Sequence, residues 1–198
     1  MLFETLKNYD IVLGSGSPRR KYLLEEMGLK FRVMVNNSLE ETWPEGISKE
    51  EIPVYLAELK GKHILEEVSE DQLLITADTI VLVGEEVINK PSGPDEAFRM
   101  LRQLSGNKHE VLTGVSFRTG KRRHSFCASS LVWFAELTNP EINYYIEHFK
   151  PFDKAGAYGI QDWIGYIGVE KIEGSYFNVM GLPLQRMYHE LKGFLGDE

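Results

Sequence analysis

The chain has little of several features that would point to particular classes of protein. It holds one cysteine, Cys127, among 198 residues, so an internal disulfide is excluded and no cysteine-based zinc site is available. No apolar run approaches the roughly 20 residues that cross a bilayer. The first residues also lack the charged and then apolar pattern of a secretory signal. We therefore expect a cytoplasmic protein without membrane partners.

The chain also has fewer basic than acidic residues. The chain has 22 lysines and arginines against 30 acidic residues, a formal net charge of -8. This balance argues against a broad electropositive face for nucleic acid, although it leaves room for one local cationic pocket. The five histidines show no metal-ligand spacing, so we expect each to be structural and any metal to be a hard, oxygen-ligated ion.

Hydrophobic residues make up 42% of the sequence, which is typical of a globular protein with a sizeable core. No repeat or low-complexity stretch divides the chain, and a single domain over residues 1–198 is the default. The apolar patterns and turn residues predict strands at 10–13, 73–83, 87–88, 111–117 and 124–137. They predict helices at 18–27 and 94–104, and three more that begin near residues 48, 138 and 183. A late hairpin is expected to pair 166–172 with 176–180. Because strands and helices alternate irregularly, we expect an α/β fold with a mixed sheet.

Residues 14–20, Gly-Ser-Gly-Ser-Pro-Arg-Arg, join the first strand to the first predicted helix. Glycines let a backbone approach a ligand closely, and a helix N-terminus presents unpaired N–H groups to an anion. Arg19 and Arg20 lie in the first helical turn, where the helix dipole disfavours cations. A bound phosphate would reconcile that conflict, because the dipole and both guanidinium groups would converge on one anion. The alternative is that each arginine pairs with a surface carboxylate.

Asp78 interrupts an apolar strand, where a carboxylate is costly unless it is paired, hydrogen-bonded or bound to metal. It is therefore either a functional acid or one held by neighbouring amides or a lysine. Lys90 ends the partner strand of the expected hairpin, which could bring it near Asp78 and a phosphate. Lys60 borders the apolar face of a helix. For both lysines a solvated side chain is the ordinary alternative.

Residues 153–161, Asp-Lys-Ala-Gly-Ala-Tyr-Gly-Ile-Gln, form a loop of small residues with two charges and a terminal amide. Such a loop suits the wall of a close-fitting ligand site. The Gln161 amide could read the edge of a base because it both donates and accepts hydrogen bonds. The alternative is a glycine-rich loop that closes over the core with Gln161 exposed.

From end to end the sequence resembles the Maf-like nucleotide pyrophosphatases. The segments that carry the resemblance are 15–20 (SGSPRR), 77–79 (ADT), 90–91 (KP), 104–106 (LSG), 153–161 (DKAGAYGIQ) and 181–184 (GLPL). The resemblance implies an α/β fold with a bent mixed sheet and a cleft between two lobes. It also implies hydrolysis of nucleoside triphosphates between the α- and β-phosphates, with a divalent metal, Mg²⁺ or Mn²⁺.

By the same resemblance, Asp78 is the proton acceptor and shares the metal with Glu40, for which Glu41 is an alternative. The substrate-binding residues that the resemblance implies are Ser15, Ser17, Arg19, Lys60, Thr79, Lys90 and Gln161. The loop ending in Gln161 resembles the branch that acts on dTTP and UTP rather than the branch that acts on 7-methyl-GTP. Arg20 is left with a structural role.

Two positions depart from the family pattern: Gly14 stands where alanine is usual, and Asn89 where an acid commonly precedes Lys-Pro. Neither removes a named catalytic group. A homodimer is a further expectation from the resemblance.

Two other classes of function stay open at this point. One is a nucleotide-binding regulator of cell division or septum formation, which would need the basic loop but not an acid embedded in a strand beside it. The other is a nucleic-acid-binding domain, which would need a basic face that this acidic chain does not show.

Overall fold

The computed structural model describes residues 2–36, 38–65 and 68–196. Its strands are β1 (Asp10–Leu13), β2 (Arg32–Val33), β3 (Gln72–Val83), β4 (Glu86–Ile88), β5 (Lys108–Thr119), β6 (Arg122–Phe134) and β7 (Val169–Glu173). Its helices are α1 (Leu2–Leu6), α2 (Pro18–Glu26), α3 (Glu51–Ile64), α4 (Pro94–Leu104), α5 (Asn139–Phe149), the short 3₁₀ turn η1 (Ala155–Ala157), α6 (Trp163–Gly168), α7 (Tyr176–Met180) and α8 (Leu184–Leu195). Across these described residues, no helix combines the length and apolar character needed to span a membrane.

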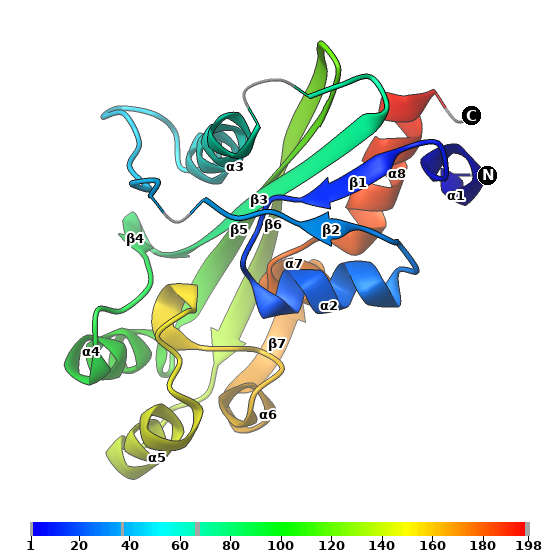
Figure 1. The fold of residues 1–198 in the computed structure, drawn as a ribbon. Helices are drawn as coiled ribbons and strands as arrows, with labels where there is room; N and C mark the ends of the chain where they lie inside the picture. Colours follow the sequence, from blue (N-terminus) through cyan, green and yellow to red (C-terminus); the bar gives the residue numbers. More distant parts are fainter. Residues whose placement is uncertain (1, 37, 66–67, 197–198) are drawn as a thin grey trace. The chain divides into compact units, whose positions relative to one another are not determined.

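The sheet is mixed, as the irregular alternation of elements predicts. Its strand order is β2-β1-β3-β5-β6-β7, with β4 paired beside β3 (Figure 1). Strand β1 runs parallel to β2 and β3, whereas β4 is antiparallel to β3 and β7 is antiparallel to β6. The flanking helices complete an α/β fold, which confirms the predicted fold class.

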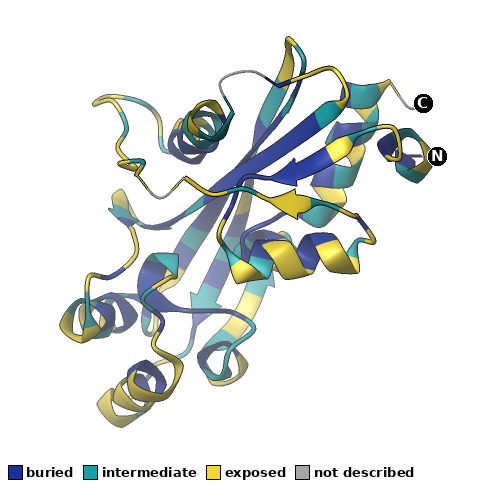
Figure 2. Cartoon of the chain, in the orientation of Figure 1, coloured by how far each residue is buried: buried dark blue, intermediate teal, exposed yellow. Residues whose placement is uncertain are grey.

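The chain forms two compact units. Unit 1 comprises residues 1–78, 113–128 and 181–198, and unit 2 comprises 79–112 and 129–180. In unit 1, β1 is buried along most of its length while β2 is exposed (Figure 2), and α1 contacts α8. In unit 2, α4 contacts both α5 and η1. Strands β3, β5 and β6 each contribute residues to both units.

Local capping signals explain where several helices begin. Ser17 is the N-cap of α2 and Pro18 its first residue, as predicted. Thr138 caps α5 through a complete capping box with Glu141. Helix α3 starts at Glu51, three residues later than predicted from Ser48.

The prediction of a late hairpin was wrong. Residues 163–168 form α6, 169–173 form β7 and 176–180 form α7, so the segment expected as the second strand is a helix. Ser175 begins that helix, because its Oγ accepts a hydrogen bond from the Asn178 backbone N–H at 3.3 Å. The Asn178 amide is buried and donates to Val111 O at 3.0 Å. The short elements α1, β2, η1 and α6 were not predicted.

Candidate active site

The loop after β1 is built around glycine and serine. A Cβ at Gly14 would lie 2.5 Å from Thr76 Cγ2 and 2.8 Å from Ile64 Cδ1, so the neighbouring side chains leave room only for glycine. Glycine at this position, where alanine is usual in the family, is compatible with that close approach. Ser15 is buried, and its Oγ accepts a hydrogen bond from the Ser17 backbone N–H at 3.3 Å. The Ser15 to Ser17 turn is thereby held at the N-terminus of α2.

Arg20 is a buried structural residue rather than a surface cation. Its Nε donates to Gly181 O at 2.8 Å, and its Nη1 donates to Ala77 O at 2.8 Å and to Ser15 Oγ at 3.2 Å. Burial lowers the pKa of the Arg20 guanidinium, an effect that the nearby Asp78 carboxylate opposes. These bonds support the structural role that the sequence left to Arg20. Its neighbour Arg19 is only half-buried.

A lysine between two carboxylates is the main electrostatic feature of unit 1. Asp78 is 5% exposed, and its Oδ1 lies 2.5 Å from Lys60 Nζ. The same ammonium lies 3.1 Å from Glu41 Oε1. The ordinary expectation of a solvated Lys60 was therefore wrong, because its side chain is only 14% exposed. Glu40 is exposed, as Glu41 is, and its backbone O accepts a hydrogen bond from the Thr42 N–H.

Close packing of α3 on the sheet places Lys60 beside Asp78. Thr76 Oγ1 donates to Ala57 O at 2.6 Å, which joins β3 to the helix. On β5, a Cβ at Gly114 would lie 2.2 Å from the carbonyl carbon of Pro53. The backbones of α3 and β5 thus approach each other as only glycine permits.

The donors in unit 1 fit a hard divalent cation that is shared with a phosphorylated substrate. Mg²⁺ in proteins is usually bound by one or two carboxylates, with waters and substrate phosphates completing its ligands. Asp78 and Glu41 supply two carboxylates that converge on one ammonium. In the described parts of the chain, no cluster of three or more His, Cys, Asp or Glu side chains could hold a metal by itself.

In unit 2, the end of β4 is tied to the 153–161 loop. Asn89 O accepts a hydrogen bond from the Gly156 N–H at 3.1 Å, so the residue that replaces the family's acid acts through its backbone. Lys90, the next residue, is exposed. Gly156 and Ala157 both have positive φ, 68° and 58°, in the tight turn of η1. Thr79, at the start of this unit, is half-buried.

Gln161 ends that loop in a defined setting. Its Nε2 donates to Asp162 Oδ1 at 3.0 Å, and Asp162 Oδ2 accepts from the Tyr145 hydroxyl at 2.7 Å. The Tyr145 oxygen also accepts from the Gly159 N–H at 3.1 Å. Gln161 Oε1 is buried and has no hydrogen-bond partner among the described residues. The alternative of an exposed Gln161 was therefore wrong.

A buried pair fixes the middle of the same loop. His109 Nε2 lies 2.8 Å from the Tyr158 hydroxyl, and both rings pack edge-on against Phe134. Burial lowers the pKa of His109 to about 4 and raises that of Tyr158. His109 is thus structural, as expected of every histidine. Nothing in the sequence indicated its partner, because the two residues lie 49 positions apart.

Comparison with known proteins identifies the class to which this fold and these residues belong. The family model for Maf-like proteins matches residues 10–194. The chain therefore belongs to the Maf-like family, which confirms the resemblance.

Two relatives of known name agree with that assignment. The dTTP/UTP pyrophosphatase of Parabacteroides distasonis is 49% identical over 98% of this chain and 100% of its own length. The dTTP/UTP pyrophosphatase of Phocaeicola vulgatus is 51% identical over 96% of this chain and 99% of its own. Among solved structures, the Ham1 protein of Staphylococcus aureus is similar over 64% of this chain and 72% of its own, with a TM-score of 0.43 and 16% identity.

Proposed function

We propose that this protein is a nucleoside triphosphate pyrophosphatase that hydrolyses dTTP and UTP to the monophosphate and pyrophosphate. The observation that supports this most directly is the buried Asp78 carboxylate, held 2.5 Å from Lys60 Nζ, in a chain about half identical to pyrophosphatases of that name. A protein that only binds a nucleotide has no need of a buried acid beside its anion loop. A nucleotide-binding regulator of cell division is therefore not favoured.

In the proposed reaction, Asp78 accepts a proton from a water that attacks the α-phosphorus. The bond from that phosphorus to the bridging oxygen of the β-phosphate breaks, and pyrophosphate leaves with the electron pair. Lys60 and Arg19 neutralise the negative charge that grows on the leaving group. Ser15 and Ser17 hydrogen-bond to phosphate in the turn before α2, and the resemblance assigns Lys90 to the same phosphates.

Mg²⁺ or Mn²⁺, when bound, would polarise the phosphate and lower the pKa of a coordinated water. Of the two acids open for this role, the geometry favours Glu41 over Glu40. Both side chains are exposed, but Glu41 Oε1 and Asp78 Oδ1 lie within 3.1 Å of Lys60 Nζ, whereas no ion pair among the described residues joins Glu40 to Lys60.

Gln161 supports a preference for thymine and uracil. Its buried Oε1 has no hydrogen-bond partner among the described residues, while its Nε2 is held by Asp162. An acceptor of this kind suits the ring N–H that uracil and thymine share, since the same position in cytosine is an acceptor. Thr79, which resembles another position linked to substrate choice, would assist.

Asp78→Asn tests the reaction. We expect pyrophosphate release from dTTP to fall by about 10²–10⁴-fold, because the amide cannot accept the proton. The dissociation constant for dTTP, measured by calorimetry, should stay within about threefold. Asp10→Asn makes the same change at an exposed carboxylate outside the site and should leave the rate unchanged. Near wild-type turnover by Asp78→Asn would remove Asp78 from the mechanism.

Rates of hydrolysis on a panel of nucleotides test which bases the protein prefers. We expect kcat/KM for dTTP and UTP to exceed the values for ATP, GTP and CTP, and Gln161→Ala to reduce that preference by about tenfold or more. The matched control is Gln103→Ala, which removes an amide that binds Glu86 in the same unit. Comparable rates on all five nucleotides would rule out the preference for thymine and uracil while leaving the hydrolysis intact.

A further inference from the structure

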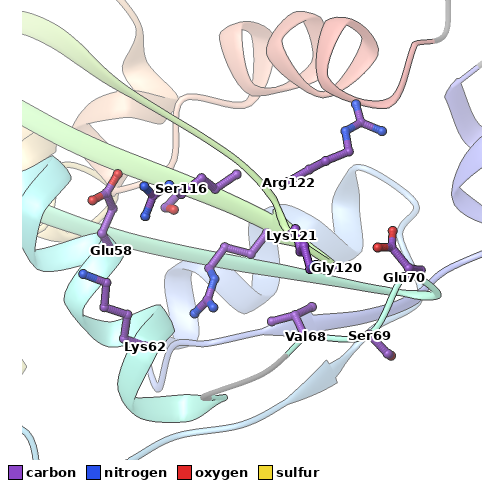
Figure 3. A pocket seen from close by; sticks show the side chains of 11 residues that line it. Glu58, Lys62, Val68, Ser69, Glu70, Ser116, Gly120, Lys121 and Arg122 are labelled. Carbon is purple, nitrogen blue, oxygen red and sulfur yellow. The ribbon is translucent and has the colours of Figure 1, made fainter.

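A second concentration of cations lies in unit 1, at the tip of the β5–β6 hairpin. A cavity of about 580 Å³ opens there, beside the C-terminal half of α3 and the segment that leads into β3 (Figure 3). Its cationic side chains are Lys62, Arg118, Lys121, Arg122 and Arg123. Two carboxylates, Glu58 and Glu70, face them. In a chain with a formal net charge of -8, this pocket is a local reversal of charge.

The walls of the pocket are joined by hydrogen bonds. The Gly120 N–H donates to Ser69 O at 3.0 Å, and Thr119 Oγ1 donates to Glu70 O at 3.1 Å. Arg118 Nη1 donates to Leu65 O at 3.2 Å, which connects β5 to the end of α3. Figure 3 shows Glu58 projecting from α3 and Ser69 in the segment beside the hairpin tip. These bonds join the hairpin to α3 and to the segment before β3, which form the walls of the cavity.

Like charges meet across the two strands. Ser125 Oγ donates to Ser116 Oγ at 3.0 Å, so these residues are cross-strand neighbours. Two positions nearer the tip, Arg118 and Arg123 therefore lie opposite each other on the same face. The hairpin thus places two guanidinium-bearing side chains on one face beside the cavity.

Among the lining residues that the structure describes, five cations face two carboxylates. The Glu58 carboxylate accepts a hydrogen bond from Ser125 Oγ at 2.8 Å. Within the described residues, no ion pair joins Lys62, Lys121 or Arg123 to a carboxylate. Charge-assisted bonds from these cations are therefore available to a ligand.

The chemistry of the lining identifies the class of ligand. Val68 is the one apolar side chain among the lining residues described, and none of them is aromatic. Proteins bind unpaired bases by stacking them on aromatic rings, so the pocket is unsuited to a base or a single strand. Its volume falls within the range of about 300–1,000 Å³ that is typical of small-molecule sites. We propose that it binds a compact polyphosphate group, through charge alone.

This site is distinct from the one around Asp78. Successive residues of an α-helix are about 100° apart around its axis. Lys60 and Lys62 therefore point to different sides of α3, the first toward Asp78 and the second into the pocket. The proposal does not depend on the pyrophosphatase reaction.

Calorimetry with inorganic tripolyphosphate on the full chain, in EDTA at low salt, tests the proposal. Lys121→Ala/Arg123→Ala removes two exposed cations of the pocket, and we expect the affinity to fall by about tenfold or more. Lys30→Ala/Lys108→Ala removes the same charge from two exposed lysines outside the pocket and should bind as the wild type does. Arg122 is left unchanged because its guanidinium lies 4.9 Å from the centre of the Phe194 ring.

Three further binding measurements decide which ligand binds and where it binds. Lys60→Ala should retain the pocket's affinity, and loss of binding in that variant alone would overturn the proposal in favour of the Asp78 site. Equal weakening by both double variants would show an unspecific ion effect and would also overturn the proposal.

dTTP should bind the pocket no more tightly than tripolyphosphate, because no base is recognised. A random oligonucleotide that bound more tightly and displaced tripolyphosphate would make the pocket a nucleic-acid site instead.

If the pocket double variant fails to fold, the single variant Lys121→Glu tests the same point. It places a carboxylate at the exposed hairpin tip and should weaken tripolyphosphate binding by a similar factor. Wild-type affinity in a folded Lys121→Glu would contradict the proposal.

Discussion

Single residues show how this chain holds a buried acid beside the loop that we propose binds phosphate. The Lys60 ammonium compensates Asp78 and Glu41 together, at 2.5 and 3.1 Å. A buried carboxylate without such a partner would be strongly disfavoured. The neighbouring arginines divide their roles in a similar way: Arg20 is buried in bonds to the protein, while Arg19 is half-buried beside it.

Exchanging each acid of the pair 40–41 for its amide should separate their roles. Glu41→Gln should raise the Mg²⁺ concentration for half-maximal pyrophosphate release by about tenfold or more, because it removes a charged oxygen near Asp78. Glu40→Gln is the matched control and should change that concentration little, since no ion pair among the described residues joins Glu40 to Lys60. If a Mg²⁺ titration shows the larger increase in that concentration for Glu40→Gln, Glu40 and not Glu41 is the metal ligand.

At the scale of elements, the contact of α3 with β5 decides where Lys60 lies. The backbone of Gly114 approaches Pro53 and Val54 so closely that a Cβ would lie 2.2 to 2.3 Å from their atoms. Those atoms are backbone and cannot rotate away. A side chain at this position would push the whole of α3 off the sheet.

Gly114→Ala should therefore lower the free energy of unfolding by about 3 kcal/mol and reduce turnover, because Lys60 moves with α3. Gly193→Ala is the matched control, at an exposed position of α8 with nothing within 4 Å of the added Cβ. It should raise the free energy of unfolding by about 0.5–1 kcal/mol. Urea titrations of both variants measure these shifts. An unchanged free energy of unfolding in Gly114→Ala would show that α3 can adjust its position.

For the molecule as a whole, the buried His109 links stability to pH. Burial lowers its pKa from 6.5 to about 4, so the unfolded chain binds a proton in that interval while the folded chain does not. The free energy of unfolding should consequently fall as pH drops from 6.5 to 4, by about 3 kcal/mol from this group.

His109→Gln removes the titrating group and keeps a polar partner for Tyr158. In urea titrations at several pH values, this variant should lose less stability between pH 6.5 and 4 than the wild type. His189→Gln, at an exposed position of α8, should follow the wild-type curve. Parallel curves for all three proteins would show that His109 does not contribute to the acid sensitivity.

Much of the architecture follows from local sequence signals. Ser17-Pro18 and the Thr138–Glu141 capping box set the starts of α2 and α5, because a cap depends on a few neighbouring residues. The same reasoning failed at 176–180, where four hydrophobic residues among five suit a strand or a helix equally. There the hydrogen bonds of the buried Asn178 and of Ser175 stabilise a helix. Strand β7 pairs with β6 instead of with this segment.

The sequence by itself determined the family, the mixed α/β fold and the segments that carry the candidate site, because motif residues and apolar periodicity are local properties. Tertiary structure alone decided which of those residues meet. Lys60 reaches Asp78 across 18 positions, and Arg20 reaches Gly181 across 161. Such contacts depend on how helices pack on a sheet, which no short window of sequence encodes.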